Sequence, residues 1–238
     1  MTQRTTLVTG ATRGIGRASA LALAQAGHHV IATGRTQGAL EELDDAITAA
    51  GGTCTLVPFD IRERDSINQL ALVIHERYGH LDGLFANAGV LGEMTPAPHV
   101  TPKIWDEVIS VNLTANVDLI RAFDPLLRAS PAGRAVFVTS GVAQSRRAYW
   151  SAYAASKAGL EAFVQSYARE IEITSLRVNL LNPGATATAM RAKAMPGEDP
   201  CTLPQPEDVA GLVVEMLSED YDRNAEVVSY REWSREDR

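Results

Sequence analysis

Tyr153 and Lys157 stand four residues apart in a stretch with a helical pattern, 151–171. This spacing places both side chains on one face of a helix. A phenol with a pKa near ~10 exchanges protons poorly at neutral pH, and a neighbouring ammonium stabilises the phenolate and lowers that pKa. The pair is therefore suited to general acid–base chemistry at an alcohol or carbonyl oxygen. A surface Tyr–Lys contact is the alternative, because the pattern alone is common.

Ser140 lies thirteen residues before Tyr153, at the end of a predicted strand over 134–139. In a parallel sheet this end is the carboxyl edge, where ligands bind. A hydroxyl at that edge could hold the substrate oxygen on which the tyrosine acts.

A glycine-rich turn, Thr9-Gly10-Ala11-Thr12-Arg13-Gly14-Ile15-Gly16, follows the first predicted strand and opens a predicted helix. Glycine lets a pyrophosphate approach the main chain, and the start of a helix attracts phosphate through its N–H groups and dipole. The spacing G-x-x-x-G-x-G differs from the commoner G-x-G-x-x-G, and an ordinary strand–helix turn is the alternative. The position between strand and helix favours a dinucleotide site.

The second predicted strand indicates which dinucleotide. An NAD site expects an acidic residue there for the ribose 2′-hydroxyl. The strand instead ends Ala32-Thr33-Gly34-Arg35, without an acid, and Arg13 stands in the phosphate turn. Guanidinium groups grip phosphate through a planar fork. The pattern favours NADP over NAD, with two solvated arginines as the alternative.

Short β-branched runs alternate with longer helical patterns along the chain. Such alternation predicts βαβ units, and so an α/β, doubly wound Rossmann fold with about seven mostly parallel strands and helices on both faces. We expect one domain over 1–238, with a proline-rich substrate loop at about 184–206. The predicted strands are 5–9, 29–33, 53–59, 81–86, 134–139, 176–181 and 226–230, and the predicted helices are 14–26, 37–50, 62–78, 105–127, 151–171 and 207–217.

The composition excludes several classes of protein. The 238 residues are 45% hydrophobic and 21% charged, which is typical of a globular protein and excludes a disordered one. A net charge of −7 argues against nucleic acids and anionic membranes as partners. Two distant cysteines and five histidines without ligand spacing predict no metal site. Without a readable signal peptide or a span of ~18–20 apolar residues, a cytoplasmic location is expected.

The motifs, in their order, resemble those of the short-chain dehydrogenase/reductase family, in its compact single-domain type. The resemblance runs from residue 5 to about residue 217, and the stretch 190–200 resembles a little-characterised bacterial branch. It rests on Thr9-Gly10-x-x-x-Gly14-x-Gly16, Asn87-Ala88-Gly89, Asn112, Ser140, Tyr153-x-x-x-Lys157 and Pro183-Gly184-x-x-x-Thr188.

The resemblance implies a role for each catalytic residue. Tyr153 would donate or accept the proton, and Ser140 would orient the substrate oxygen. Lys157 would lower the pKa of the tyrosine and bind the nicotinamide ribose. Asn112 would support a proton relay through water and Lys157.

The resemblance also implies the residues that bind the cofactor. Asp60 would contact the adenine, Asn87 and Gly89 would border a ribose, and Thr188 would hold the carboxamide. Asn87 could instead tie neighbouring strands, and Asp60 could cap the following helix. The whole implied set is Gly10, Thr12, Arg13, Gly14, Ile15, Gly16, Arg35, Asp60, Ile61, Asn87, Ala88, Gly89, Tyr153, Lys157, Pro183, Gly184, Thr186 and Thr188.

Some features near the expected substrate site stay open. Arg146 and Arg147 could attract an anionic substrate, although a solvated loop is favoured. Trp150, Met190 and Met195 could form an apolar wall or lid, or could simply pack. The chain end departs from the family pattern, because 226–238 lacks a glycine-rich strand ending. Its charged stretch, 231–238, is expected to fray.

Together these features predict an NADP-dependent oxidoreductase that transfers hydride between the nicotinamide and a carbonyl or secondary alcohol. A carbonyl reductase for ketones or 3-oxoacyl groups is favoured, and a non-catalytic NADP-binding sensor is the alternative. The motifs disfavour a sugar-nucleotide epimerase and an enoyl reductase. The resemblance implies a homodimer or homotetramer that assembles through the two long helices, 105–127 and 151–171.

Overall fold

The computed structural model describes residues 3–236. In this part of the chain, the strands form one sheet in the order β3-β2-β1-β4-β5-β6-β7, and every neighbouring pair is parallel. The predicted doubly wound α/β fold is confirmed. The strands are β1 (Thr5–Val8), β2 (His29–Gly34), β3 (Thr53–Pro58), β4 (Gly83–Ala86), β5 (Arg134–Val138), β6 (Arg177–Asn182) and β7 (Val227–Ser229).

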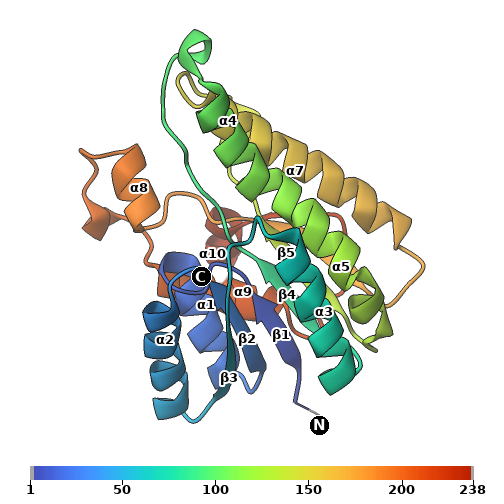
Figure 1. The fold of residues 1–238 in the computed structure, drawn as a ribbon. Coiled ribbons are helices and arrows are strands. Elements are labelled where there is room, and N and C mark those ends of the chain that lie inside the picture. The colour runs from blue at the N-terminus through green and yellow to red at the C-terminus, as the bar shows by residue number, and fades with distance from the viewer. Residues whose placement is uncertain (1–2, 237–238) are drawn as a thin grey trace.

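Helices cover both faces of this sheet (Figure 1). One face packs against α1 (Gly14–Gln25), α2 (Gln37–Ala49) and α9 (Pro206–Met216). The other packs against α3 (Arg64–Tyr78), α5 (Ala115–Ala129) and α7 (Ser151–Glu170). Successive strand residues point to opposite faces, so Leu7 joins one core cluster and Val8 the other.

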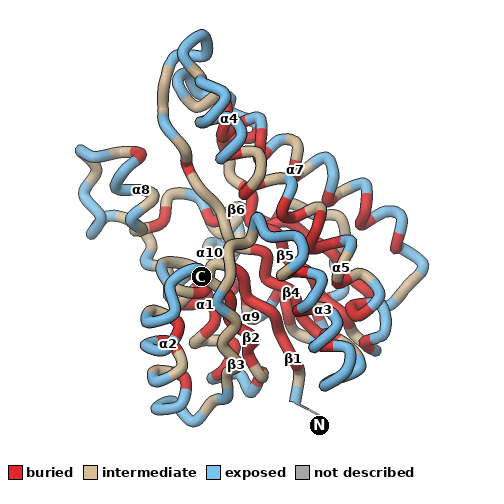
Figure 2. The backbone as a smooth tube through the Cα atoms, in the orientation of Figure 1, coloured by how far each residue is buried: buried red, intermediate tan, exposed pale blue. Residues whose placement is uncertain are grey.

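Burial on both faces explains why the strands read as near-continuous apolar runs. Figure 2 shows the buried residues concentrated in the central strands and on the inner sides of the helices. The edge strand β3 is only partly buried. No helix among residues 3–236 has both the length and the hydrophobicity that a membrane span needs.

The long helix predicted over 105–127 differs in the structure. It begins earlier, as α4 (Pro102–Ile109), passes through the π-helical turn η2 (Ser110–Thr114), and continues as α5 to Ala129. Thr101 sets the start, because its side chain accepts a hydrogen bond from the Ile104 N–H. The extra residue of a π turn leaves the apolar spacing on both sides intact, so the sequence pattern does not reveal it.

The prediction of a frayed C-terminal end is wrong for the described residues. α10 (Tyr230–Glu236) follows β7, and Trp233 packs into the core cluster beneath α9. The Trp233 Nε1 donates to a Glu215 carboxylate oxygen at 2.8 Å. Tyr230 packs against the same cluster, with its ring centroid 5.8 Å from that of Trp233, so two aromatic residues hold this end of the chain.

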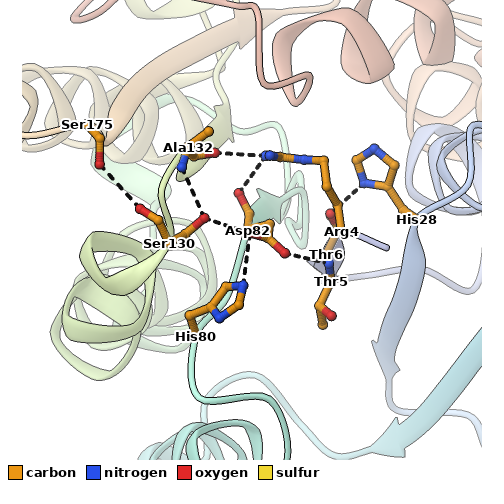
Figure 3. A network of polar contacts seen from close by, with 9 residues as sticks. All are labelled: Arg4, Thr5, Thr6, His28, His80, Asp82, Ser130, Ala132 and Ser175. Carbon is orange, nitrogen blue, oxygen red and sulfur yellow. Dashed lines mark hydrogen bonds and ion pairs between the residues drawn. The ribbon is translucent and has the colours of Figure 1, made fainter. Parts of the chain in front are cut away.

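The amino-terminal edge of the sheet holds a buried polar network (Figure 3). Asp82, which precedes β4, accepts hydrogen bonds from the Thr5 N–H at 2.9 Å and from the Ser130 hydroxyl at 2.6 Å. The Arg4 guanidinium donates to the carbonyls of Asp82 and Ala132 at 3.0 and 2.9 Å. These contacts pair backbone groups at the starts of three strands, at the edge opposite the one where ligands are expected.

His28 lies next to this network and should make the fold sensitive to acid. Its Nδ1 lies 2.8 Å from the Thr6 hydroxyl, and burial, reinforced by the Arg4 charge, lowers its pKa from 6.5 to about 4. Between these values the unfolded chain binds a proton that the folded chain does not, so stability falls as pH falls. From pH 6.5 to pH 4, the unfolding free energy of the wild type should fall by on the order of 2 kcal/mol more than that of His28→Gln.

Urea unfolding of the wild type and of His28→Gln at both pH values measures this effect. The exposed residue His99 supplies the matched control, His99→Gln. If His28→Gln and His99→Gln lose stability equally on acidification, burial of His28 is not the cause.

Candidate active site

The carboxyl ends of the strands open into a cleft of about 490 Å³. It lies where the strand order reverses, between β1 and β4, so the segments that follow six strands reach it. Ser140 lines it, whereas Gly16 and Asn112 are buried outside its lining. The other predicted site residues line it, namely Gly10, Thr12, Arg13, Gly14, Ile15, Arg35, Asp60, Ile61, Asn87, Ala88, Gly89, Tyr153, Lys157, Pro183, Gly184, Thr186 and Thr188.

The glycine turn packs closely on itself and on the end of β4, with no space for side chains at Gly10 and Gly16. Gly10 has a φ of +64°, which favours glycine. A Cβ on Gly16 would lie 2.2 Å from the Gly10 oxygen and 2.4 Å from Asn87 Nδ2. The same Asn87 Nδ2 donates to the carbonyls of Thr9 and Gly10 at 3.0 and 3.2 Å. Asn87 therefore ties the end of β4 to the turn after β1, and its place beside a cofactor ribose stays a prediction.

The start of α1 can receive an anion. The helix begins at Gly14, and the N-cap residue Arg13 makes no side-chain capping hydrogen bond. The N–H groups of the first turn, at the positive end of the helix dipole, can therefore donate to a phosphate in the cleft.

Positive charge gathers at the end of the cleft beyond β2. Arg13 and Arg35 line it with exposed side chains. Asp60 also lines it, but Arg62 neutralises that carboxylate with two guanidinium hydrogen bonds of 3.0 and 2.6 Å. These bonds, and more weakly the Arg35 charge, lower the pKa of Asp60. The alternative role of Asp60 as a helix cap is wrong, because α3 has Glu63 as its N-cap.

The predicted catalytic pair lies at the other end of the cleft. Burial raises the pKa of Tyr153 to about 12, and a hydrogen bond with Ser140 opposes this rise. The Lys157 Nζ lies 5.8 Å from the centroid of the Tyr153 ring and donates to the Val138 carbonyl at 2.7 Å. Burial therefore dominates the pKa of Tyr153 in this arrangement, and the lowering of that pKa by Lys157 stays a prediction.

Asn112 lies in the π-helical turn and positions the neighbouring strand end. Its side chain accepts from the Val90 N–H at 2.8 Å and donates to the Val90 carbonyl at 2.9 Å and to the Ser156 hydroxyl at 3.0 Å. The carbonyl of Asn112 accepts from Asn116 Nδ2 at 2.8 Å. These contacts hold the segment after β4 against α7, and the relay role of Asn112 stays a prediction.

Glu161 links α7 to the segment that follows β5, and the motifs found in the sequence do not include it. Its two carboxylate oxygens accept from the Thr139 hydroxyl and from the Gln144 amide, each at 2.7 Å. Burial lowers the pKa of Lys157 to about 8, and the charge of Glu161 opposes that shift. The only sequence signal for Glu161 is its position four residues after Lys157, one turn along the same helix.

The proline-rich loop carries a short helix, α8 (Ala189–Ala194), that the sequence pattern does not predict. Thr188 caps it by accepting from the Arg191 N–H at 3.2 Å. The Lys193 Nζ donates to the Gly92 carbonyl at 2.9 Å, so α8 is fastened to the segment after β4. Ala189, Met190, Arg191 and Ala194 line the cleft.

The structure shows which of the apolar and arginine side chains near the substrate end reach the cleft. Trp150 and Met190 line the cleft, whereas Met195 packs against the same apolar cluster outside the lining. Arg146 and Arg147 are exposed and stand outside the lining. The prediction that these two arginines lie in a solvated loop agrees with the structure.

Comparison with known proteins places the chain in a family. The family model described as short chain dehydrogenase matches residues 4–199. The oxidoreductase YciK of Escherichia coli (strain K12) is 39% identical over 231 residues, which cover 92% of this chain and 88% of that protein. A short chain dehydrogenase from Salmonella enterica subsp. enterica serovar Typhi str. CT18 is 38% identical, with a TM-score of 0.93 over 96% of each chain.

A third relative was solved with a cofactor. The short chain dehydrogenase from Escherichia coli CFT073 complexed with NADPH is 37% identical, with a TM-score of 0.92 over 97% of this chain and 98% of that chain. The chain therefore belongs to the short-chain dehydrogenase/reductase family, in the bacterial branch that includes YciK.

Proposed function

We propose that the protein is an NADP-dependent carbonyl reductase that acts on ketone or 3-oxoacyl-type carbonyls. One observation carries the proposal: a single cleft holds the glycine turn and Arg35 at one end, and Ser140, Tyr153 and Lys157 at the other. A dinucleotide that binds its phosphates at the turn would extend toward the tyrosine. The NADPH-bound relative supports this choice of cofactor.

The residues present fit this cofactor. The N–H groups at the start of α1, beside Gly14 in the cleft lining, would hold the pyrophosphate. Gly10 and Gly16 let the turn pack closely on its neighbours, because a Cβ at either position would meet protein atoms at 3.0 Å or less. Arg13 and Arg35 would hold a 2′-phosphate, since Arg62 cancels the charge of Asp60 beside them. The bound cofactor supplies the hydride. Lys157 and Thr188 would hold its nicotinamide half.

Tyr153 can supply the proton in the reducing direction. A phenol with a pKa of about 12 is protonated at neutral pH and can donate its proton to a carbonyl oxygen. Ser140, in hydrogen-bond contact with Tyr153, would hold that oxygen. The Lys157 ammonium would favour the phenolate left after proton transfer.

A panel of ketones, aldehydes and 3-oxoacyl thioesters, followed by NADPH absorbance, tests the proposal. We expect NADPH consumption with at least one class of carbonyl, and NADH should replace NADPH poorly. Tight NADPH binding without turnover of any carbonyl would instead favour the non-catalytic sensor.

Glu161→Gln should change the pH dependence of this reaction. Loss of the carboxylate removes the charge that raises the Lys157 pKa, so the ammonium should lose its proton at lower pH. The alkaline limb of the pH profiles of kcat and of NADPH affinity should therefore move to lower pH. Glu170→Gln, on the exposed side of α7, is the matched control. Superimposable profiles for Glu161→Gln and the wild type would exclude this electrostatic role.

We also propose that residues 1–238 act as one domain and assemble in the cytoplasm as a homodimer or homotetramer. The helices α4 and α7 support an assembly, because Trp105 and Phe163 are 44% and 39% exposed on them. Light scattering of the purified protein measures the mass of the assembly, and a monomer at micromolar concentration would contradict this part of the proposal.

A further inference from the structure

The substrate end of the cleft is apolar. Beyond Ser140, an apolar cluster packs around the tyrosine ring. Its members come from the segment after β4, from α6 (Val142–Ser145), from the start of α7 and from the loop that carries α8. They are Leu91, Met94, Val142, Trp150, Tyr153, Ala154, Met190, Ala194 and Met195.

Trp150 gives this end a flat wall. Its ring stands at 66° to the Tyr153 ring, with 6.0 Å between centroids, in an edge-to-face arrangement. The Tyr149 carbonyl accepts from the Thr95 N–H at 3.1 Å, which fastens the loop before Trp150 to the segment after β4. Met190, which also lines the cleft, adds an adaptable apolar surface.

The arginine that lines this end is already paired, and Arg147, whose charge also acts on Glu198, is exposed outside the lining. Arg191 lines the cleft, but its guanidinium makes a two-pronged ion pair with Glu198, in which Nη2 lies 2.7 Å from Oε1. About a quarter of each side chain is exposed, at 22% and 27%. The same pairing lowers the pKa of Glu198, so the carboxylate stays charged. Lys157 is nearly fully buried and bonded to Val138, and Lys193 is bonded to Gly92.

A buried anion without a partner pays a large desolvation penalty. Of the described cations that line the substrate end, Arg191 is paired with Glu198, and Lys157 is buried, donates to the Val138 carbonyl and is expected to hold the nicotinamide ribose. The two free arginines of the lining, Arg13 and Arg35, lie at the opposite end, where the 2′-phosphate is expected. A substrate anion would therefore have to displace Glu198 from Arg191.

We infer that the substrate is an uncharged carbonyl compound with a flat, apolar body, and that Glu198 determines this specificity by neutralising Arg191. The inference rests on the proposed carbonyl reduction. The apolar body would pack on Trp150 and Met190 while the carbonyl oxygen meets Ser140 and Tyr153. Glu198 acts through Arg191 and has no part in the chemical step.

Two nearly isosteric aldehydes, 4-methylbenzaldehyde and 4-carboxybenzaldehyde, test the inference. In the wild type, kcat/KM should be at least about tenfold higher for the methyl compound. Glu198→Gln frees Arg191 and should change the ratio of the two kcat/KM values by about tenfold in favour of the carboxylate. The difference in intrinsic reactivity between the two aldehydes is the same for the wild type and for Glu198→Gln, so it cancels when the two ratios are compared. Glu172→Gln, at an exposed and distant position, should leave the ratio unchanged.

A binding measurement separates this inference from the proposed function. Calorimetry compares 4-methylbenzyl alcohol with 4-(hydroxymethyl)benzoate on the enzyme loaded with NADPH, because an alcohol and the reduced cofactor cannot react with each other. If neither aldehyde is reduced, the proposed function is in question, whereas tighter binding of the neutral alcohol still supports the apolar site. A wild type that prefers the carboxylate in both measurements, or a ratio that Glu198→Gln leaves unchanged, overturns the inference.

Discussion

Tyr153→Phe should lower kcat by at least about 10²–10³-fold while NADPH affinity stays within about twofold of the wild type. The substitution removes one hydroxyl from a ring that is 9% exposed and packed among Trp150, Met190 and Leu91. The ring keeps its packing, so the fold should survive. Only the proton donor to the carbonyl oxygen is lost, together with its hydrogen bond to Ser140. Steady-state turnover and NADPH fluorescence titration measure the two quantities.

A matched variant isolates the effect of the missing hydroxyl. Tyr78→Phe removes a phenol at the end of α3, where its oxygen lies 3.1 Å from His29 Nε2. This variant should keep its kcat. If Tyr153→Phe turned over at a rate close to that of the wild type, another group would have to donate the proton.

Arg35→Ala should weaken NADPH binding by about 10–100-fold and NADH binding by no more than about threefold. NADH lacks the 2′-phosphate, and Arg35 lines the end of the cleft where that phosphate would lie. Because Arg35 is exposed, the NADPH preference of the wild type should also shrink as ionic strength rises. Titration of both cofactors at low and high salt measures both effects.

The control for Arg35→Ala removes an equal charge elsewhere. Arg77→Ala lies in the last turn of α3 and should leave the NADPH preference intact. If Arg35→Ala lost NADPH and NADH affinity equally, Arg35 would not be the residue that recognises the 2′-phosphate.

The sequence was sufficient to predict what depends on local pattern. β-Branched runs of five to seven residues, alternating with longer helical patterns, predicted the strands and the parallel sheet. A parallel sheet then placed every loop that follows a strand at one edge, so residues as distant as Gly10 and Thr188 could be assigned to one site. The steric reason for Gly16 became visible only in the fold, where Asn87 reaches it from another strand.

What the sequence did not predict depends on side-chain partners chosen in three dimensions. Arg62 forms an ion pair with Asp60, and Glu198 forms one with Arg191. From the sequence alone, each of these charged residues is expected to be exposed to solvent. The pKa of Tyr153 follows from its burial, which a four-residue spacing to Lys157 does not encode. The short helix α8 depends on the Thr188 cap and the Lys193 contact with Gly92, and six residues are too few for a periodic signal.

Transfer of deuterium from the cofactor to a carbonyl carbon tests the central claim most directly. The protein would be incubated with NADPH deuterated on either face of the nicotinamide C4 and with a carbonyl from the panel, and the product analysed by mass spectrometry. The account predicts an alcohol that carries one deuterium on the carbinol carbon from one face only, and none when Tyr153→Phe replaces the wild type. An alcohol without deuterium from either face, or unchanged NADPH with every carbonyl, would contradict it.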